Sequence, residues 1–358
     1  MQSNRPLGYP TLPYLLPYLN SNLRFSLACR SLSIKKLYAT IPSIITDLII
    51  QSDSFIIDNT TYKISIIEVI KNDNYPDLFF RKECYANEFQ YEVDDYGLKL
   101  DYEANLNGNI WLLKQQGLYE KKLKEDPPER LDRDFSRYHL KKNRIESPFA
   151  HYLQLTIMNK DNKTIGVYRL ERNHTITEAL NYLLLQIVQP KTLVRNLSVD
   201  NSDYLTLLSP RINYEQYPLK TLIIGGLGNP DELIQQTAKL LVLSSPNRDF
   251  SVITNNRVHF QSCSLLLTSR FIDDTINWAT QAGKHASVGV KNMKDVEKML
   301  NAIRNHFVHS LGRLSESEEG AIQKCIVIQI ADDLELVIYS VGLMIHAKTQ
   351  PSGYAVLL

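Results

Sequence analysis

Closely spaced leucines dominate the first forty or so residues of the chain. Their spacing across residues 9–38 predicts two or three short helices, which open with Thr11 as the N-cap and Pro13 in the first turn, where a missing N–H costs nothing. Pro17 falls in the interior of the first helix, so that helix is either bent or divided into two short turns. A helical unit this small cannot bury a core of its own, so its leucines pack either on the protein behind it or on a partner.

After this segment the helical spacing of the leucines ends, and runs rich in β-branched residues follow. Three runs within residues 44–69 predict strands, and the turn pair Asp58-Asn59 joins the last two as a hairpin. Residues 71–110 show little period and predict loops with short strands. Residues 119–146 are dense in both charges and predict an exposed amphipathic helix that connects the flanking segments.

A second hairpin and an apolar helix follow. Residues 151–158 and 164–171 alternate with a period of two around a polar turn at 159–162. Thr175 and Glu178 then form the signature of a capping box at the start of a strongly apolar helix. We expect this helix to be buried.

Short leucine-rich strands recur in the next part of the chain. Each strand is followed by a turn, and the strands are residues 193–199, 219–226, 238–246 and 258–267. Leu197, Leu222, Leu241 and Phe260 lie 25, 19 and 19 positions apart, within or just below the leucine-rich repeat range of about 20–29 residues. This spacing predicts an irregular, leucine-rich-repeat-like stack of parallel strands.

The last third of the chain predicts two helices and three strands. The helical periodicity covers residues 270–281 and 290–307, and the second of these carries Met293, Val296, Met299, Leu300 and Ile303 at helical spacing. Residues 324–347 alternate as three short strands. We expect these strands to pair antiparallel and to close the open end of the stack.

The succession of these elements predicts an α+β protein. A helical module at residues 1–43 precedes a larger domain at residues 44–358. The larger domain is expected to contain β-hairpins and the charged connector helix at 44–147, leucine-rich-repeat-like strands and helices at 148–270, and helices with closing antiparallel strands at 271–358.

Composition narrows the classes of protein that the chain can represent. A net charge of +1 over 358 residues gives no basis for a nucleic-acid-binding surface. None of the four cysteines lies close to another in sequence, which excludes a CxxC metal or redox motif and favours a reduced, intracellular setting. The N-terminus lacks the apolar segment of a signal peptide, and the apolar runs are too short to span a bilayer. We therefore expect a cytoplasmic or nuclear protein that does not bind membranes.

Motifs for catalysis or cofactor binding are few. The glycine-rich segment 225–230 lacks the Lys-Ser/Thr pair of a phosphate-binding loop and predicts a turn. His306 and His309 share one predicted helix, but no third ligand stands at a metalloprotease spacing. We therefore expect no cofactor, no metal ion and no enzymatic activity. An enzyme would need a deep pocket with clustered titratable groups.

Three stretches of the chain carry a family resemblance. Residues 9–42 open with Tyr-Pro, continue with spaced leucines, an Arg and a Ser-Ile, and end at Ile-Pro. This opening, the hairpin at 56–67 with its Asn-Thr turn, and the closing strands at 324–358 resemble a large nematode-specific group of F-box-like proteins. The strands at 193–199 and 219–226 fall where that family has its repeat-like strands.

The resemblance implies a substrate receptor of an SCF-type cullin-RING ubiquitin ligase, with residues 1–43 as its F-box-like module. Helices of this kind bind a Skp-type adaptor subunit through leucine and proline side chains. Carried over to this sequence, the adaptor contacts are Pro10, Leu12, Leu15, Leu16, Leu19, Leu23 and Leu27. Tyr9 stands before Pro10 where ordinary F-boxes have a leucine.

The larger domain then holds a target protein, and a toxin is one candidate because some nematode F-box proteins act as antidotes. Binding is expected to centre on aromatic and arginine anchors in loops beside the strands. These anchors are Tyr204, Arg211, Tyr214, Tyr217 and Arg248, although the tyrosines can equally pack at the sheet edge. The alternative function is a stand-alone protein-binding scaffold or inhibitor without ubiquitin transfer, in which the N-terminal leucines pack inward on residues 44–70.

Overall fold

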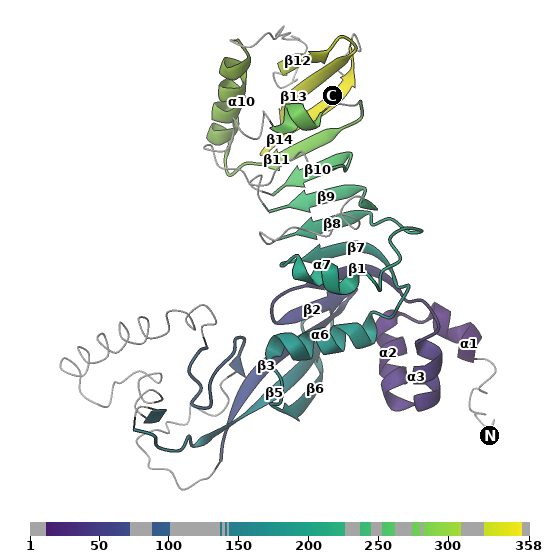
Figure 1. Cartoon of the computed structure of the whole chain (residues 1–358), viewed down its shortest axis with the longest axis vertical. Helices are drawn as coiled ribbons and strands as arrows, with labels where there is room; N and C mark the ends of the chain where they lie inside the picture. Colours follow the sequence, from purple (N-terminus) through teal and green to yellow (C-terminus); the bar gives the residue numbers. More distant parts are fainter. Residues whose placement is uncertain are drawn as a thin grey trace, which may run out of the picture. The chain divides into compact units, whose positions relative to one another are not determined.

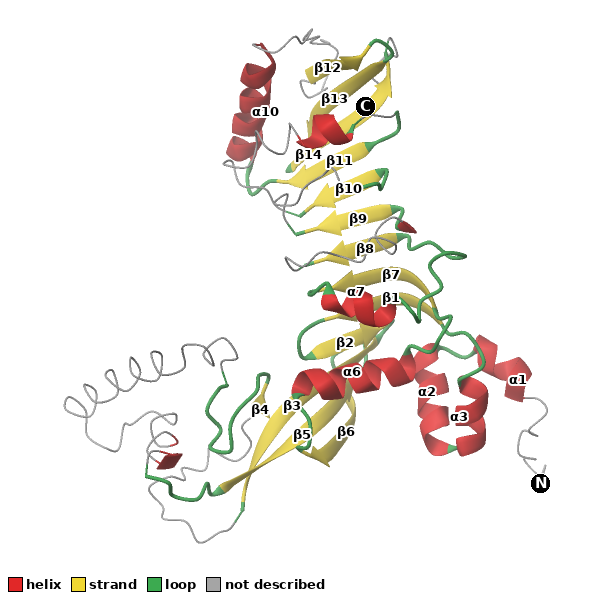
Figure 2. Cartoon of the chain, in the orientation of Figure 1, coloured by secondary structure: helices red, strands yellow, loops and turns green. Residues whose placement is uncertain are grey.

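The computed structural model describes residues 12–71, 88–100, 137, 140–141, 143–225, 237–244, 253–261, 274–279, 282–308 and 326–352. The chain divides into two compact units. Met1–Ile50 and Val188–Leu358 make up the first unit, and Gln51–Ile187 make up the second. Figure 1 labels the elements of both units, and Figure 2 separates their few helices from the more numerous strands. The protein is therefore a mixed α and β structure dominated by strands.

Short helical segments open the described part of the first unit. They are α1 (Leu12–Leu15), the 3-10 turn η2 (Leu16–Tyr18), α2 (Ser21–Arg30) and α3 (Leu32–Tyr38). Pro17 lies inside η2, and the backbone becomes extended at Leu19, with φ −80° and ψ 144°. The first predicted helix therefore consists of two short turns, one of the two outcomes expected from Pro17.

Parallel strands form the body of the first unit. In spatial order they are β1 (Ile44–Ile50), β7 (Leu193–Val199), β8 (Thr221–Ile224), β9 (Leu240–Leu243), β10 (Arg257–Phe260) and β11 (His285–Gly289). Each strand pairs in parallel with the next, so that they stack like rungs in Figure 1. A parallel pair needs a crossover connection, and the connection between β1 and β7 contains the whole second unit.

Leucines that pair in register on neighbouring strands fill one face of this parallel sheet. Leu197, Leu222 and Leu241 are direct register partners, and all three are buried. On β10 the register partner of Leu241 is Val258, and Phe260 pairs with Leu243. A difference of two positions keeps a side chain on the same face of a strand, so Phe260 is buried although it does not lie in register with Leu241.

Antiparallel strands complete the sheet of the first unit. β14 (Met344–Pro351) pairs with β11, β13 (Leu334–Val341) pairs with β14, and β12 (Ile326–Ala331) pairs with β13. The three strands predicted at the end of the chain are therefore confirmed. They lie beside β11, where the parallel order ends.

Two amphipathic helices of the first unit bury their apolar sides. In α7 (Asp203–Leu208) the buried side chains include Leu205 and Leu208. In α10 (Met293–Val308) Val296, Met299 and Ile303 are buried, as their helical spacing predicted. A further helical turn covers residues 274–278 within the segment predicted as the earlier helix.

Hairpins build the sheet of the second unit. Its strands are β2 (Ser54–Ile57), β3 (Thr60–Ile70), β4 (Glu88–Phe89), β5 (Phe149–Met158) and β6 (Thr164–Glu171). They pair antiparallel in the order β2-β3-β5-β6, with β4 also on β3. Asp58 and Asn162 adopt positive φ in the two hairpin turns, which aspartate and asparagine tolerate better than other non-glycine residues.

A capping box begins the helix of the second unit, α6 (Ile176–Ile187). The Glu178 amide donates to Thr175 Oγ1 at 3.1 Å, and the Thr175 amide donates to Glu178 Oε2 at 2.9 Å. The hydrogen bond from the Thr175 backbone lowers the pKa of Glu178 from its ordinary value. The predicted capping box is confirmed, and the buried side chains of α6 include Leu180 and Leu184.

The units divide the chain at other places than the sequence analysis proposed. Residues 44–50 join the first unit because β1 pairs with β7, so the division falls after residue 50 and not after residue 43. Residues 149–171 join the second unit because β5 pairs with β3 and β6 pairs with β5. Of the connector helix predicted at 119–146, Arg137, Leu140 and Lys141 are helical and residues 143–146 are not; the other positions lie outside the described residues.

Among the helices in the described residues, none combines the length and the apolar character that crossing a bilayer requires.

We expect the buried register of leucines to dominate the stability of the first unit. Leu222→Ala should lower the free energy of unfolding by about 3 kcal/mol, because it leaves a cavity between two parallel neighbours. Ile223→Ala, on the opposite and half-exposed face of β8, should cost about 1 kcal/mol. Urea unfolding followed by Trp278 fluorescence in a Trp111→Phe background measures both, and equal losses would contradict the assignment of the buried face.

Candidate functional site

The N-terminal helices expose large apolar side chains. Tyr14 is 76% exposed, Tyr18 88% and Leu32 79%. Leu15 and Leu23 are also exposed, to smaller extents. Tyr14, Leu15 and Tyr18 lie on consecutive short turns, and Leu23 and Leu32 follow on α2 and α3. We refer to these five residues as the N-terminal apolar surface, a concentration of apolar groups typical of a protein-binding site.

A buried arginine gives these short helices a fixed arrangement. Arg24, on α2, is 1% exposed, and its guanidinium donates to the Ile41 carbonyl at 2.9 Å and to the Pro42 carbonyl at 3.1 and 3.2 Å. The same guanidinium lies 5.5 Å from the centre of the Tyr38 ring at the end of α3. Burial lowers the pKa of Arg24 from its ordinary value, while Tyr38 raises it. Arg24 therefore ties α2 to the segment that follows α3.

Local caps complete this helical unit. The Leu23 amide donates to Asn20 Oδ1 at 2.7 Å at the start of α2, and the Ile34 amide donates to Ser31 Oγ at 3.5 Å at the start of α3. Ser21, at the first position of α2, donates to the Ile44 carbonyl at 3.0 Å. The helices are thus fixed to the chain that enters β1, while the N-terminal apolar surface faces solvent.

The predicted adaptor contacts are only partly exposed. Leu15 and Leu23 are exposed, Leu19 and Leu27 are half-buried, and Leu16 is fully buried. Pro10 and the side chain of Leu12 lie outside the described residues. Tyr14, Tyr18 and Leu32 were not among the predicted adaptor contacts. The two tyrosines lie at an irregular helix start, where they follow no distinctive helical period.

The predicted target anchors do not gather into one patch of exposed side chains. Tyr204 is buried on α7, which agrees with the alternative that it packs on the sheet. Arg211 is half-buried and donates to the Val188 carbonyl at 3.2 Å, and the Tyr214 hydroxyl lies 3.5 Å from Ser209 Oγ. Tyr217 is exposed, and Arg248 lies outside the described residues.

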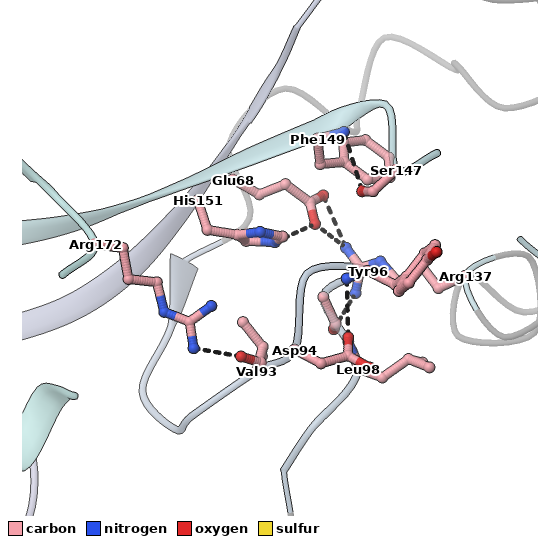
Figure 3. Close-up of polar contacts among 11 residues, drawn as sticks. Glu68, Val93, Asp94, Tyr96, Leu98, Arg137, Ser147, Phe149, His151 and Arg172 are labelled. Carbon is pink, nitrogen blue, oxygen red and sulfur yellow. Dashed lines mark hydrogen bonds and ion pairs between the residues drawn. The ribbon is translucent and has the colours of Figure 1, made fainter. Parts of the chain in front are cut away.

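A polar cavity of about 770 Å³ lies in the second unit. Its lining includes Glu92, Asp94, Glu146, His151, Arg172 and Glu178. Figure 3 shows the polar groups beside the cavity. They include groups from β3, from β5 and from the segment that follows β4. The sequence analysis found no motif for this cavity, because its residues are dispersed along the chain.

A buried ionic cluster, Glu68, Arg137 and His151, supports this cavity. Arg137 Nη2 donates to both carboxylate oxygens of Glu68 at 2.8 Å, and His151 Nε2 lies 3.3 Å from Glu68 Oε2 (Figure 3). Arg137 Nη1 also donates to the Gly97 carbonyl at 3.0 Å, and its guanidinium lies 5.1 Å from the centre of the Phe89 ring. Glu68, an acidic residue within the apolar end of β3 at residues 66–70, is the sequence signal that could have indicated this cluster.

Carboxylates of the cavity lining take part in structural contacts. Glu92 pairs with Arg172 at 3.2 Å and accepts from the Ile176 amide. Asp94 accepts from the Tyr96 and Leu98 amides at 2.9 Å. Glu146 pairs with Lys71, and Glu178 belongs to the capping box. These contacts give the four carboxylates structural roles.

No group of three or more His, Cys, Asp or Glu side chains placed to hold a metal ion occurs in the part of the chain that the structure describes. The side chains of His306 and His309, the pair weighed in the sequence analysis, lie outside it.

Comparisons of the chain with models of protein families, with curated proteins and with solved structures find no match.

Arg24→Met tests whether the arginine fixes the helical unit. The substitution should lower the stability of α2 and α3 by about 2–3 kcal/mol, because the carbonyls of Ile41 and Pro42 lose their buried donor. Amide hydrogen exchange across residues 21–38 should accelerate accordingly. Arg30→Met removes an exposed arginine from the same helix and should leave exchange unchanged, so equal acceleration in both variants would refute the role of Arg24.

Glu68→Gln tests the buried ionic cluster. It removes the negative charge beside Arg137 at constant size and should lower the stability of the second unit by about 3–5 kcal/mol. Glu88→Gln breaks the more exposed pair between Glu88 and Lys63 and should cost less than about 1 kcal/mol. Urea unfolding of both variants provides the comparison, and a small loss for Glu68→Gln would show that the cluster contributes little.

Proposed function

We propose that this protein is a substrate-recognition subunit of an SCF-type cullin-RING ubiquitin ligase. Its N-terminal helices act as an F-box-like module that binds a Skp-type adaptor, and its larger part binds a target protein. The observation that carries this proposal is the N-terminal apolar surface, a set of exposed apolar side chains on α1, η2, α2 and α3, of which Arg24 fixes α2 to the segment after α3. A surface that is ordered before binding loses little conformational entropy when a partner docks.

The burial of the individual leucines favours a division of labour within residues 12–38. Leu16 is fully buried and anchors the first turns, whereas Leu15 and Leu23 remain available to a partner groove. Tyr14 and Tyr18 add large, rigid apolar groups of the kind enriched at binding hot spots. The adaptor contact is thus expected to use Tyr14, Leu15, Tyr18 and Leu23, a set that overlaps the contacts implied by the family resemblance.

The leucine-rich-repeat-like description of the strand stack belongs to the same proposal. Its support is the direct register of Leu197, Leu222 and Leu241 on successive parallel strands. A stack of this kind presents an extended face to a target. In this function the protein catalyses no reaction, takes no cofactor, binds neither nucleic acid nor membrane, and acts in the cytoplasm or nucleus.

A second candidate function is a stand-alone scaffold or inhibitor, such as an antidote, that binds its target without ubiquitin transfer. The complete burial of Leu16 favours it, because this leucine was one of the expected adaptor contacts. In this case the N-terminal helices serve to complete the core of the first unit, and the exposed residues have no partner on the adaptor.

Co-expression with a Skp-type adaptor distinguishes the two functions. The wild-type chain should co-purify with the adaptor, and a Leu15→Asp, Leu23→Asp double variant should lose capture at least tenfold, because both substitutions place a charge in an apolar contact. Both positions are exposed, so the variant should keep the wild-type unfolding temperature.

Tyr182→Asp and Val341→Asp together provide the matched control, since both residues are exposed and lie outside the N-terminal helices. Retained capture by this control would assign the adaptor site to the N-terminal apolar surface. Absence of capture by the wild-type chain would instead support the stand-alone binding protein.

A further inference from the structure

One face of the first-unit sheet carries a row of basic residues across three adjacent strands, β10, β11 and β14. Arg257 on β10 is the register partner of His285 on β11, and His285 is the partner of Lys348 on β14. Arg257 and Lys348 are exposed, and His285 is half-buried between them. We refer to Arg257, His285 and Lys348 as the basic row. Cross-strand partners lie about 4.5–5.5 Å apart at Cβ, so the three side chains can reach one ligand.

A second row of hydrogen-bonding groups runs beside the basic row. It consists of His259, Ser287, His346 and Tyr339, which are successive register partners on β10, β11, β14 and β13. His259 Nδ1 lies 2.9 Å from Ser287 Oγ, and His285 Nε2 lies 3.1 Å from His346 Nδ1, which joins the two rows. The Tyr339 ring stacks on His346 with 5.1 Å between the ring centres.

The two cations of the basic row lie on either side of β11. Among the described residues neither Arg257 nor Lys348 forms an ion pair. The carboxylate that faces the rows from β13 is Glu335, which is the register partner of Gln350. Beside the rows, the register partner of His259 on β9 is Val242 and that of Lys348 on β13 is Val337; both are uncharged and buried.

The electrostatic state of the histidines follows from this arrangement. Burial is the largest of the effects that lower the pKa of His285 to about 4. The neighbouring His346, Arg257 and Lys348 also contribute to this lowering. Burial also lowers the pKa of His259 and His346 from their ordinary values. All three imidazoles are therefore neutral at pH 7, and a negative charge seated against them would favour their protonated forms.

We propose that the basic row is a docking site for an acidic, carboxylate-rich segment of a target protein. The site deepens the proposed function, since it names the chemistry of the target and the face of the stack that holds it. Carboxylates would accept hydrogen bonds from Arg257 and Lys348, and the half-buried Leu240 on β9 would support methylene groups of the segment.

Proton uptake couples to this binding with a defined sign. A bound carboxylate that returns the pKa of His285 from about 4 to its ordinary 6.5 tightens binding roughly tenfold between pH 7.5 and pH 5.5. Carboxylates of the ligand stay ionised over this range, so the change reports on the histidines. Affinity should also fall with added salt, because the contact is exposed.

Fluorescence anisotropy with a rhodamine-labelled hexaglutamate peptide tests the site on the full chain. Hexaglutamate should bind more tightly at pH 5.5 than at pH 7.5, and hexaglutamine should bind at neither pH. An Arg257→Gln, Lys348→Gln variant should lose about tenfold in affinity. His285→Asn should reduce the pH dependence, to which His259 and His346 also contribute, while leaving binding at pH 7.5.

Arg195→Gln, Lys239→Gln removes the same charge from exposed positions of the same unit and should bind hexaglutamate like the wild type. Equal losses in the two double variants, or a pH dependence that is as large in His285→Asn as in the wild type, would overturn the site. The measurement does not involve the adaptor, so its failure leaves the ubiquitin-ligase proposal standing, and failure of adaptor capture leaves the acidic-segment site standing.

Discussion

The in-register burial of one residue per parallel strand is the constraint on which the first unit depends. Once Leu197 is buried on β7, parallel pairing requires an apolar side chain at the same height on β8 and β9, and Leu222 and Leu241 supply it. Because strand side chains alternate, the same register also decides what faces outward. The basic row is a product of this rule, since Arg257 and His285 lie one position from the buried Val258 and Ala286.

Two arginines show different solutions to burying a positive charge. Arg24 is held by backbone carbonyls at the end of the N-terminal helices, so its site needs no acidic partner. Arg137 is held by the carboxylate of Glu68 and lies against an aromatic ring. Burying an ion is costly in both cases, and several hydrogen bonds to the same group offset that cost. Both residues join segments that are distant from each other in sequence.

Sequence patterns predicted those elements whose signals are local. The hairpin at Asp58-Asn59 and the capping box of Thr175 and Glu178 follow from a few adjacent residues, and both occur as predicted. The pairing of β1 with β7 could not be predicted, because the sequence of a strand such as Ile44–Ile50 does not show which other strand it pairs with. The cavity of the second unit was missed for the same reason, since Glu68 meets Arg137 across 69 positions. The N-terminal leucines were interpreted as adaptor contacts, but their spacing could not show that Leu16 is buried while Leu15 is exposed.

The insertion of the second unit between β1 and β7 has a consequence for the order of folding. Asp47 and Asn196 lie on paired strands although they are 149 positions apart in sequence. Closing so long a loop is entropically costly unless the intervening chain is already compact. The hairpins of the second unit are local contacts and form quickly, whereas the pairing of β1 with β7 is among the slowest kinds of contact to form. During synthesis β1 therefore leaves the ribosome well before its partner strand. Strand β1 and the N-terminal helices attached to it cannot complete their packing until β7 has been made.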